Sequence, residues 1–121
     1  MRLFLGCLTI LSFILLTQGA FGEADGPDFW VVYGVADDDV LNIRQEADWR
    51  SRKTGEIPPD GQCIRNLGCV GGLTLMEFTT LSEAEKAKIR KERPRWCRIE
   101  YNGITGWVAG RYLREGACSA K

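Results

Sequence analysis

The feature that most constrains the fold is an Asn-Gly pair between two short runs of residues within positions 96–113. Asn102 and Gly103 both tolerate a positive φ, which the type I′ turn of a two-residue β-hairpin requires. The residues before the pair alternate between two faces, with Cys97, Ile99 and Tyr101 on one and Arg98 and Glu100 on the other. After the pair, Gly-Trp-Val resumes an extended path. The segment therefore predicts two antiparallel strands joined by a tight turn.

Further strands are predicted upstream of the hairpin. Phe29–Val35 is rich in aromatic and β-branched residues and predicts a strand, which a charged Asp37–Asp39 turn separates from Val40–Arg44. Alternation in this second strand places Leu41 and Ile43 on one face. Gln45–Glu56 lacks periodicity and predicts a long loop. After a turn at Pro58–Gly61, Cys63–Arg65 is expected to be extended.

A helical segment is predicted between this extended stretch and the hairpin, within Leu67–Arg95. Thr74 with Glu77 and Ser82 with Glu85 each fit a capping box. Good helix formers then run from Glu83 to about Glu92, and Pro94 ends the helix. Its apolar stripe is narrow, which indicates a surface element. The basic residues gathered here predict a solvated helix face or, alternatively, a docking surface for an acidic partner. They are Lys86, Lys88, Arg90, Lys91, Arg93 and Arg95.

Four elements occur in an order that resembles the bacterial SH3-like domain family. They are Leu-Asn-Ile-Arg at Leu41–Arg44, the turn at Pro58–Gly61, the Trp-x-x-Ile to Gly-Trp-Val hairpin at Trp96–Val108, and Tyr112-Leu113. The resemblance covers residues 35–113 and implies a mostly β fold, a small SH3-like β-barrel. The compact family pattern has only a few residues where this chain has 67–95, so we expect a short helical insertion there. The family further implies a binding module without a reaction, often in secreted or envelope proteins.

The N-terminal residues predict export. Arg2 precedes a mostly apolar run at Leu3–Leu16, and Ala20-Phe21-Gly22 offers small residues at the positions that signal peptidase reads. We expect a signal peptide at residues 1–22 cleaved after Gly22, with cleavage after Ala20 as the alternative. The apolar run is shorter than the ~20 residues of a spanning helix, so no stable membrane span is expected after cleavage. Residues 23–34 then form a lead-in and first strand, and 35–121 the SH3-like domain.

The charge balance excludes one class of partner. The chain has 16 Lys and Arg and 16 Asp and Glu, and removal of residues 1–22 takes away only Arg2. A near-neutral protein lacks the positive excess that nucleic-acid binding calls for. It is also poorly suited to docking on an anionic membrane by charge alone. We therefore expect no nucleic acid as partner and no docking on a membrane through charge alone.

Cysteine usage points to an oxidising compartment, so we expect a secreted protein that resides in the periplasm. After signal cleavage the cysteines are Cys63, Cys69, Cys97 and Cys118, an even number that predicts two disulfides. Three pairings are open, and we favour Cys63 with Cys69 and Cys97 with Cys118. A zinc site is the competing use, but the chain has no histidine and no Cys-x-x-Cys. No metal and no cofactor are expected.

The residue inventory argues against catalysis. Without histidine there is no imidazole base, and no Gly-x-Ser-x-Gly or phosphate-loop pattern occurs. The acidic groups at Asp37–Asp39 and at Glu83 with Glu85 are explained by a turn and a helix start. We therefore expect a protein that is not an enzyme.

Aromatic residues beside cations favour binding instead. Trp49 lies in a polar loop next to Arg50 and Arg52, a setting that suits stacking and bidentate contacts with a carboxylate ligand. Trp96 shares its strand face with Arg98, whereas Trp107 is expected to pack within the barrel. For Trp49 and Trp96 the alternative is packing against the inserted helix. The candidate contacts are Trp49, Arg50, Trp96, Arg98, Tyr101 and Arg111.

These residues predict an exported binding module for a peptide, a peptidoglycan fragment or an envelope protein. Peptidoglycan stem peptides carry the carboxylates that such a site would recognise. The alternative is an inhibitor or accessory subunit of an envelope enzyme that acts through the helical insertion at 67–95.

Overall fold

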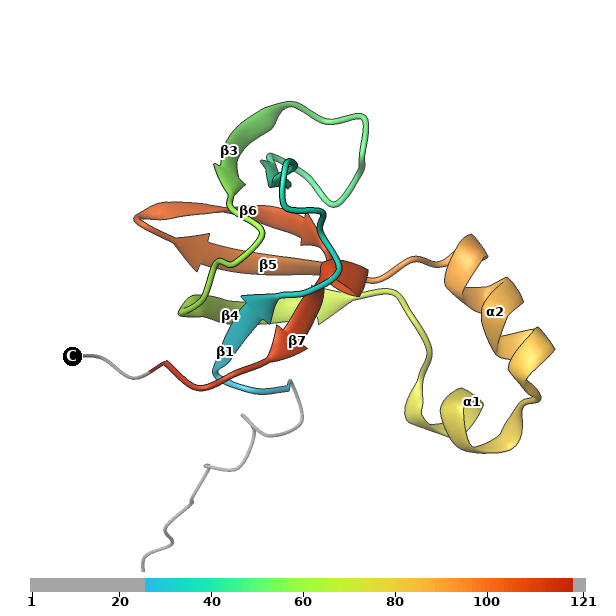
Figure 1. Ribbon diagram of the computed structural model, residues 1–121. Coiled ribbons are helices and arrows are strands. Elements are labelled where there is room, and N and C mark those ends of the chain that lie inside the picture. The colour runs from blue at the N-terminus through green and yellow to red at the C-terminus, as the bar shows by residue number, and fades with distance from the viewer. Residues whose placement is uncertain (1–25, 119–121) are drawn as a thin grey trace, which may run out of the picture.

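The computed structural model describes residues 26–118, so the predicted signal peptide lies outside the described residues. The strands form one antiparallel sheet of seven, in the order β3-β2-β6-β5-β4-β1-β7. Their bounds are β1 Phe29–Val32, β2 Leu41–Arg44, β3 Lys53–Ile57, β4 Ile64–Val70, β5 Trp96–Tyr101, β6 Ile104–Ala109 and β7 Leu113–Glu115. Two helices, α1 (Leu75–Thr80) and α2 (Glu83–Glu92), form an arm that stands away from the sheet (Figure 1).

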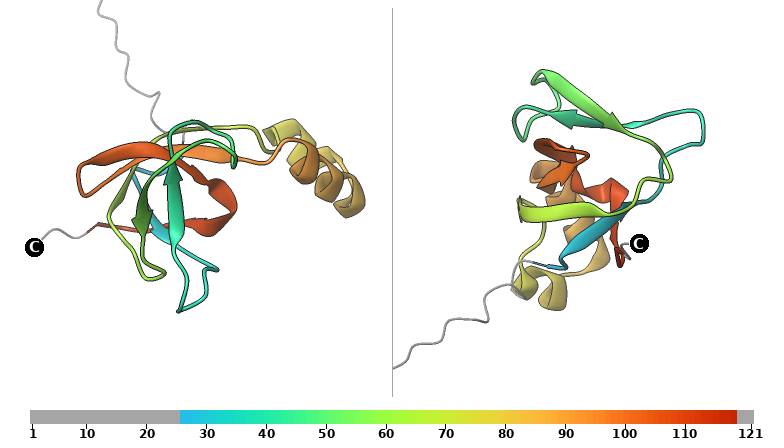
Figure 2. Two further views of the ribbon diagram at one scale, coloured as in Figure 1. Left: turned by 90° about the horizontal axis from the view of Figure 1, so that it is seen from above. Right: turned by 90° about the vertical axis from the view of Figure 1, so that its left-hand side faces the viewer.

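The sheet curls around one apolar core (Figure 2). The buried side chains are Trp30, Val32, Leu41, Ile43, Ile57, Ile64, Cys97, Ile99, Val108 and Leu113. The predicted mostly β fold is confirmed. Closure into a barrel is not confirmed, because β3 and β7 stand at opposite ends of the strand order and no pairing between them is found in residues 26–118. Within the same residues, no helix is both long and apolar enough to cross a membrane.

The Asn-Gly hairpin forms as the sequence predicts. β5 and β6 pair from Trp96 with Ala109 to Tyr101 with Ile104, and φ is 50° at Asn102 and 81° at Gly103. The core face of β5 carries Cys97 and Ile99, and that of β6 carries Gly106 and Val108. Trp107 points to the other face, is half-buried and pairs with Arg98, so it is not part of the buried core.

Two predicted boundaries are wrong. The loop predicted over Gln45–Glu56 ends early, because Lys53–Ile57 is β3 and pairs with β2, with one register shift between Ile43 and Arg44. The insertion starts after Val70 rather than at Leu67, because β4 continues to Val70 and, after a register shift between Asn66 and Cys69, still pairs with β5. Pairing with a neighbouring strand makes each of these segments extended, and this pairing cannot be recognised from the local periodicity of the sequence.

The favoured disulfide pairing is also wrong, although all four cysteines are oxidised. The bonds join Cys63 with Cys118 and Cys69 with Cys97. β4 keeps the chain extended between Cys63 and Cys69 and so separates them. Cys69 instead faces Cys97 across the β4–β5 pair, with a Cα–Cα distance of 3.9 Å. Cys63 precedes β4 and reaches Cys118 beyond the end of β7.

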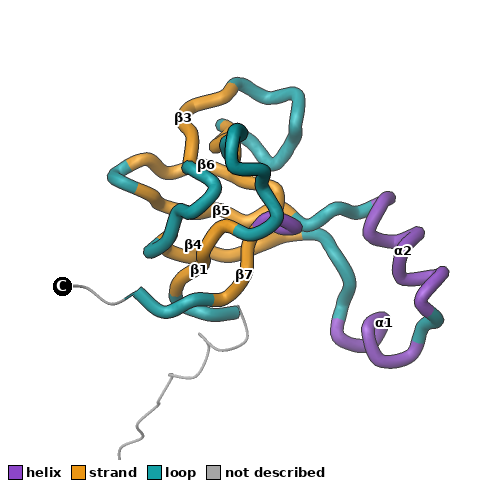
Figure 3. The backbone as a smooth tube through the Cα atoms, viewed as in Figure 1, coloured by secondary structure: helices purple, strands orange, loops and turns teal. Residues whose placement is uncertain are grey.

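The arm is a small helical unit with its own contacts. Both predicted capping boxes are present, at Thr74 with Glu77 and at Ser82 with Glu85. An ion pair of 2.6 Å joins Arg93 to Glu77 and so holds the end of α2 against α1. Lys86, predicted on a solvated face, is only 8% exposed, because its ammonium lies over the Phe78 ring. Figure 3 shows that loops connect this unit to the sheet only at the ends of β4 and β5.

Candidate functional site

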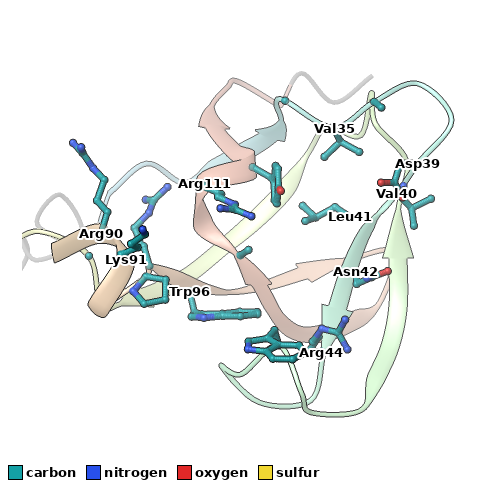
Figure 4. Close-up of a pocket in the computed structure, with 18 of the residues that line it drawn as sticks. Val35, Asp39, Val40, Leu41, Asn42, Arg44, Arg90, Lys91, Trp96 and Arg111 are labelled. Atoms are coloured by element: carbon teal, nitrogen blue, oxygen red, sulfur yellow. Dashed lines mark hydrogen bonds between the residues drawn. The ribbon is translucent and has the colours of Figure 1, made fainter. Parts of the chain in front are cut away.

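A groove of about 1100 Å³ lies between the sheet and the arm. Four stretches of the chain line it (Figure 4). The first leads into β2 and continues along it to Arg44, within residues 34–44, and the second is Trp49 in the loop after β2. The third is α2 with the neck that joins the arm to the sheet, at Gly72, Leu73, Ala87, Arg90, Lys91 and Pro94–Trp96. The fourth is the end of β6 with the following 3₁₀ helix (Gly110–Tyr112), at Ala109, Arg111 and Tyr112. The groove therefore depends on both the sheet and the insertion.

Three of the predicted contacts line this groove, namely Trp49, Trp96 and Arg111. Trp96 is the first residue of β5, and strand alternation places it on the opposite face from buried Cys97. Trp49 is 69% exposed, in a loop held by the Ser51 hydroxyl, which donates to the carbonyls of Glu46 and Asp48. The alternative explanation of Trp49 as a packed residue does not fit this exposure.

The other three predicted contacts, Arg50, Arg98 and Tyr101, are not among the groove-lining residues. Arg50 forms an ion pair with Asp48 at 3.6 Å, and its backbone N–H, then its charge, lower the pKa of that carboxyl group. Arg98 is exposed on β5, and half-buried Tyr101 packs against the core. A shared strand face thus did not bring Arg98 and Trp96 into one groove.

Sequence reasoning missed several lining residues. They are Asp39, Arg44, Arg90, Lys91, Arg95 and Tyr112. Arg90, Lys91 and Arg95 belong to the basic run that the sequence did reveal, but the run alone does not distinguish the residues that face the sheet. Arg44 was visible as the outward residue of Leu-Asn-Ile-Arg, and it also donates to the Ser51 carbonyl at 2.9 Å.

Arg95 fixes the neck of the arm to the sheet. Its guanidinium donates to the Gly110 carbonyl at 2.6 Å and lies 5.2 Å from the centre of the Trp30 ring. The Gly110 N–H donates in return to the Arg95 carbonyl at 2.8 Å. Burial lowers the pKa of Arg95 from its usual value. A side chain at position 110 would collide with this arginine, because a Cβ there would lie 2.6 Å from Arg95 Nε.

The groove is strongly positive. Its lining holds five cations and one carboxylate: Arg44, Arg90, Lys91, Arg95 and Arg111 against Asp39. Aromatic surface is supplied by Trp49, Trp96 and Tyr112, the last with the Arg111 guanidinium 4.9 Å from its ring centre. Guanidinium groups bind carboxylates bidentately, and aromatic rings add contact area at low entropic cost. The arrangement suits an anionic ligand with planar or apolar surface.

In residues 26–118, no group of three or more His, Cys, Asp or Glu side chains is placed so that it could hold a metal ion.

Searches of curated proteins and of solved structures found no match for the chain. The family model described as a bacterial SH3 domain matches residues 77–114. This range runs from the arm through β5, β6 and the 3₁₀ helix into β7, and so contains the hairpin and Tyr112-Leu113. The resemblance that the sequence motifs predicted is thereby confirmed over residues 77–114, which are similar to the bacterial SH3 domain family.

Proposed function

We propose that this protein is an exported, non-catalytic binding module that takes a peptide or a peptidoglycan fragment into the groove between the sheet and the arm. The observation that carries the proposal is the meeting of Trp49, Trp96 and Arg111 in one cavity of about 1100 Å³. This volume lies slightly above the ~300–1,000 Å³ of small-molecule sites, so the groove has room for an oligomeric ligand. The curled sheet, in the manner of an SH3-like barrel, serves as the scaffold.

Chemistry favours peptidoglycan among the anionic polymers of the envelope. Its stem peptides offer carboxylates to the cations and flexible apolar segments to the aromatic rings. A periplasmic location agrees with two disulfides, which form and persist in oxidising compartments. The bacterial SH3 domain match likewise agrees with a binding role.

Sedimentation with purified, insoluble peptidoglycan tests this proposal. The wild-type protein should sediment with the polymer, and Trp49→Ala should lower its affinity by roughly 30-fold, as expected for loss of an aromatic anchor worth about 2 kcal/mol. Trp49 is exposed, so the substitution should leave the fold intact. Wild-type protein that stays in the supernatant would reject the wall ligand.

A second candidate function uses the arm rather than the groove. Leu75, Met76 and Phe78 on α1 are 79%, 72% and 55% exposed, an apolar surface that few monomeric helices leave uncovered. This surface suits an inhibitor or accessory subunit that docks on an envelope enzyme.

The two functions are separable with one pair of variants. The double substitution Leu75→Ala and Met76→Ala removes exposed side chains of α1 that do not line the groove. It should leave sedimentation with peptidoglycan unchanged and abolish capture of an envelope protein. Trp49→Ala should weaken sedimentation with peptidoglycan and leave capture of the envelope protein unchanged. Loss of wall binding in the α1 variant would contradict the assignment of the wall ligand to the groove.

A further inference from the structure

Charge is distributed unevenly along the groove. Figure 4 shows Arg90 and Lys91 of α2 at one end, with Arg111 toward the same side, and Asp39 at the opposite end beyond Leu41. Asp37 and Asp38 precede Asp39 and are exposed, so the acidic end carries further negative charge. The two ends therefore present opposite charges to one ligand.

The cations at the arm end are available for binding. No salt bridge within 4 Å joins Arg90, Lys91 or Arg111 to a carboxylate of residues 26–118. The remaining lining cations are already engaged, since Arg95 donates to the Gly110 carbonyl and Arg44 to the Ser51 carbonyl. The arm end thus holds three lining cations without a carboxylate partner within 4 Å among the described residues.

The acidic end is available as well. One Asp39 oxygen accepts the N–H of Val40 at 2.8 Å, which fixes the carboxylate in the turn. No lysine or arginine in the described part of the chain lies within 4 Å of it. A ligand ammonium placed there would gain an ion pair, and a ligand carboxylate would be repelled.

We propose that the groove binds a zwitterionic peptide in one direction, with its carboxylates beside Arg90, Lys91 and Arg111 and its ammonium beside Asp39. The proposal rests on the groove being the ligand site and adds the class and orientation of the ligand. A peptide bound in the opposite direction would place like charges together at both ends of the groove. Attraction in one direction and repulsion in the other therefore both specify the orientation of the peptide. Arg90 and Lys91 belong to the insertion, so the arm contributes two of the three cations on which this specificity depends.

A defined peptide allows a direct test in the oxidised protein. The probe is L-Ala-γ-D-Glu-L-Ala-D-Ala, which has a single ammonium at its first residue and two carboxylates further along. Its dissociation constant is measured by NMR titration at low salt, with the free peptide and with its N-acetylated form. Asp39→Asn should weaken the free peptide by about fivefold and leave the acetylated peptide unaffected, because an exposed ion pair is lost only in the first case. Equal effects on both peptides would overturn the proposal.

Reversing the charges at the arm end tests where the carboxylates of the peptide bind. Arg90→Glu with Lys91→Glu should weaken both peptides by about tenfold or more, whereas Lys88→Ala, an exposed lysine of α2 outside the groove, should change neither. A probe with a nitroxide-labelled cysteine in place of its first alanine, and with the ammonium left free, should broaden amide signals of residues 36–41 and spare those of 88–92. The opposite broadening, or no binding of the probe at millimolar concentration, would overturn the proposal. Sedimentation of the wild-type protein with peptidoglycan would survive either failure.

Discussion

Removal of the Cys63–Cys118 disulfide is predicted to destabilise the protein by a large amount. The bond closes a loop with a sequence separation of 55 residues. Loop-closure entropy for that length gives about 4 kcal/mol of stabilisation. Cys63 is exposed and Cys118 half-buried, so replacing both by alanine removes the cross-link with little loss of buried surface. For a domain of this size the melting temperature should fall by roughly 15–30 °C.

Urea denaturation of the Cys63→Ala, Cys118→Ala variant measures this loss against the wild-type protein. A thiol count in the same variant tests the pairing, because an intact Cys69–Cys97 bond leaves no free thiol apart from Cys7. The pairing favoured by sequence would instead leave Cys69 and Cys97 free. Two free thiols, or a loss of unfolding free energy below about 1 kcal/mol, would refute the reasoning.

Three smaller perturbations follow from local geometry. Gly110→Ala should lower the free energy of unfolding, measured in urea, by about 1–3 kcal/mol, because its Cβ would displace Arg95. A variant as stable as the wild-type protein would contradict the role of Arg95 in fixing the neck to the sheet. Gly103→Ala should cost about 1–2 kcal/mol in the same assay, because φ is 81° there and the added Cβ meets no other atom; an unchanged midpoint would argue against the type I′ turn. The pKa values of Glu77 and Glu85 lie below the usual 4.5, chiefly because each carboxylate accepts a backbone N–H of its capping box. A lowered pKa stabilises the arm above the unfolded value and loses that effect as pH falls through the folded value. NMR should therefore show that α1 and α2 lose helicity below about pH 4.5 before the sheet changes. Loss of the helices and the sheet at the same pH would contradict this prediction.

Local signals in the sequence predicted the local structure well. The Asn102-Gly103 turn and both capping boxes depend on residues within four positions of one another, so the sequence contains all of their determinants. The disulfides do not share this property. Cys63 and Cys69 are close in sequence, yet an extended strand between them makes their pairing impossible, and only the β4–β5 register identifies Cys97 as the partner of Cys69.

The candidate site was predictable only in part for the same reason. Trp49 and Arg111 could be recognised by composition and motif, and the structure brings them to one groove. Arg90 and Lys91 became recognisable only when the arm was placed beside the sheet. Lys86 lies in the same basic run but is buried with its ammonium over the Phe78 ring, so the charge pattern alone could not separate a structural lysine from its exposed neighbours.

The central claim is that the groove, rather than the strand face of β5, holds the ligand. Binding isotherms on purified peptidoglycan for Arg111→Ala and Arg98→Ala test it most directly. Both arginines are exposed, but only Arg111 lines the groove. The account predicts a loss of affinity of roughly tenfold for Arg111→Ala, as for a charge-assisted hydrogen bond worth about 1.4 kcal/mol, and an unchanged affinity for Arg98→Ala. A loss of affinity confined to Arg98→Ala would contradict it.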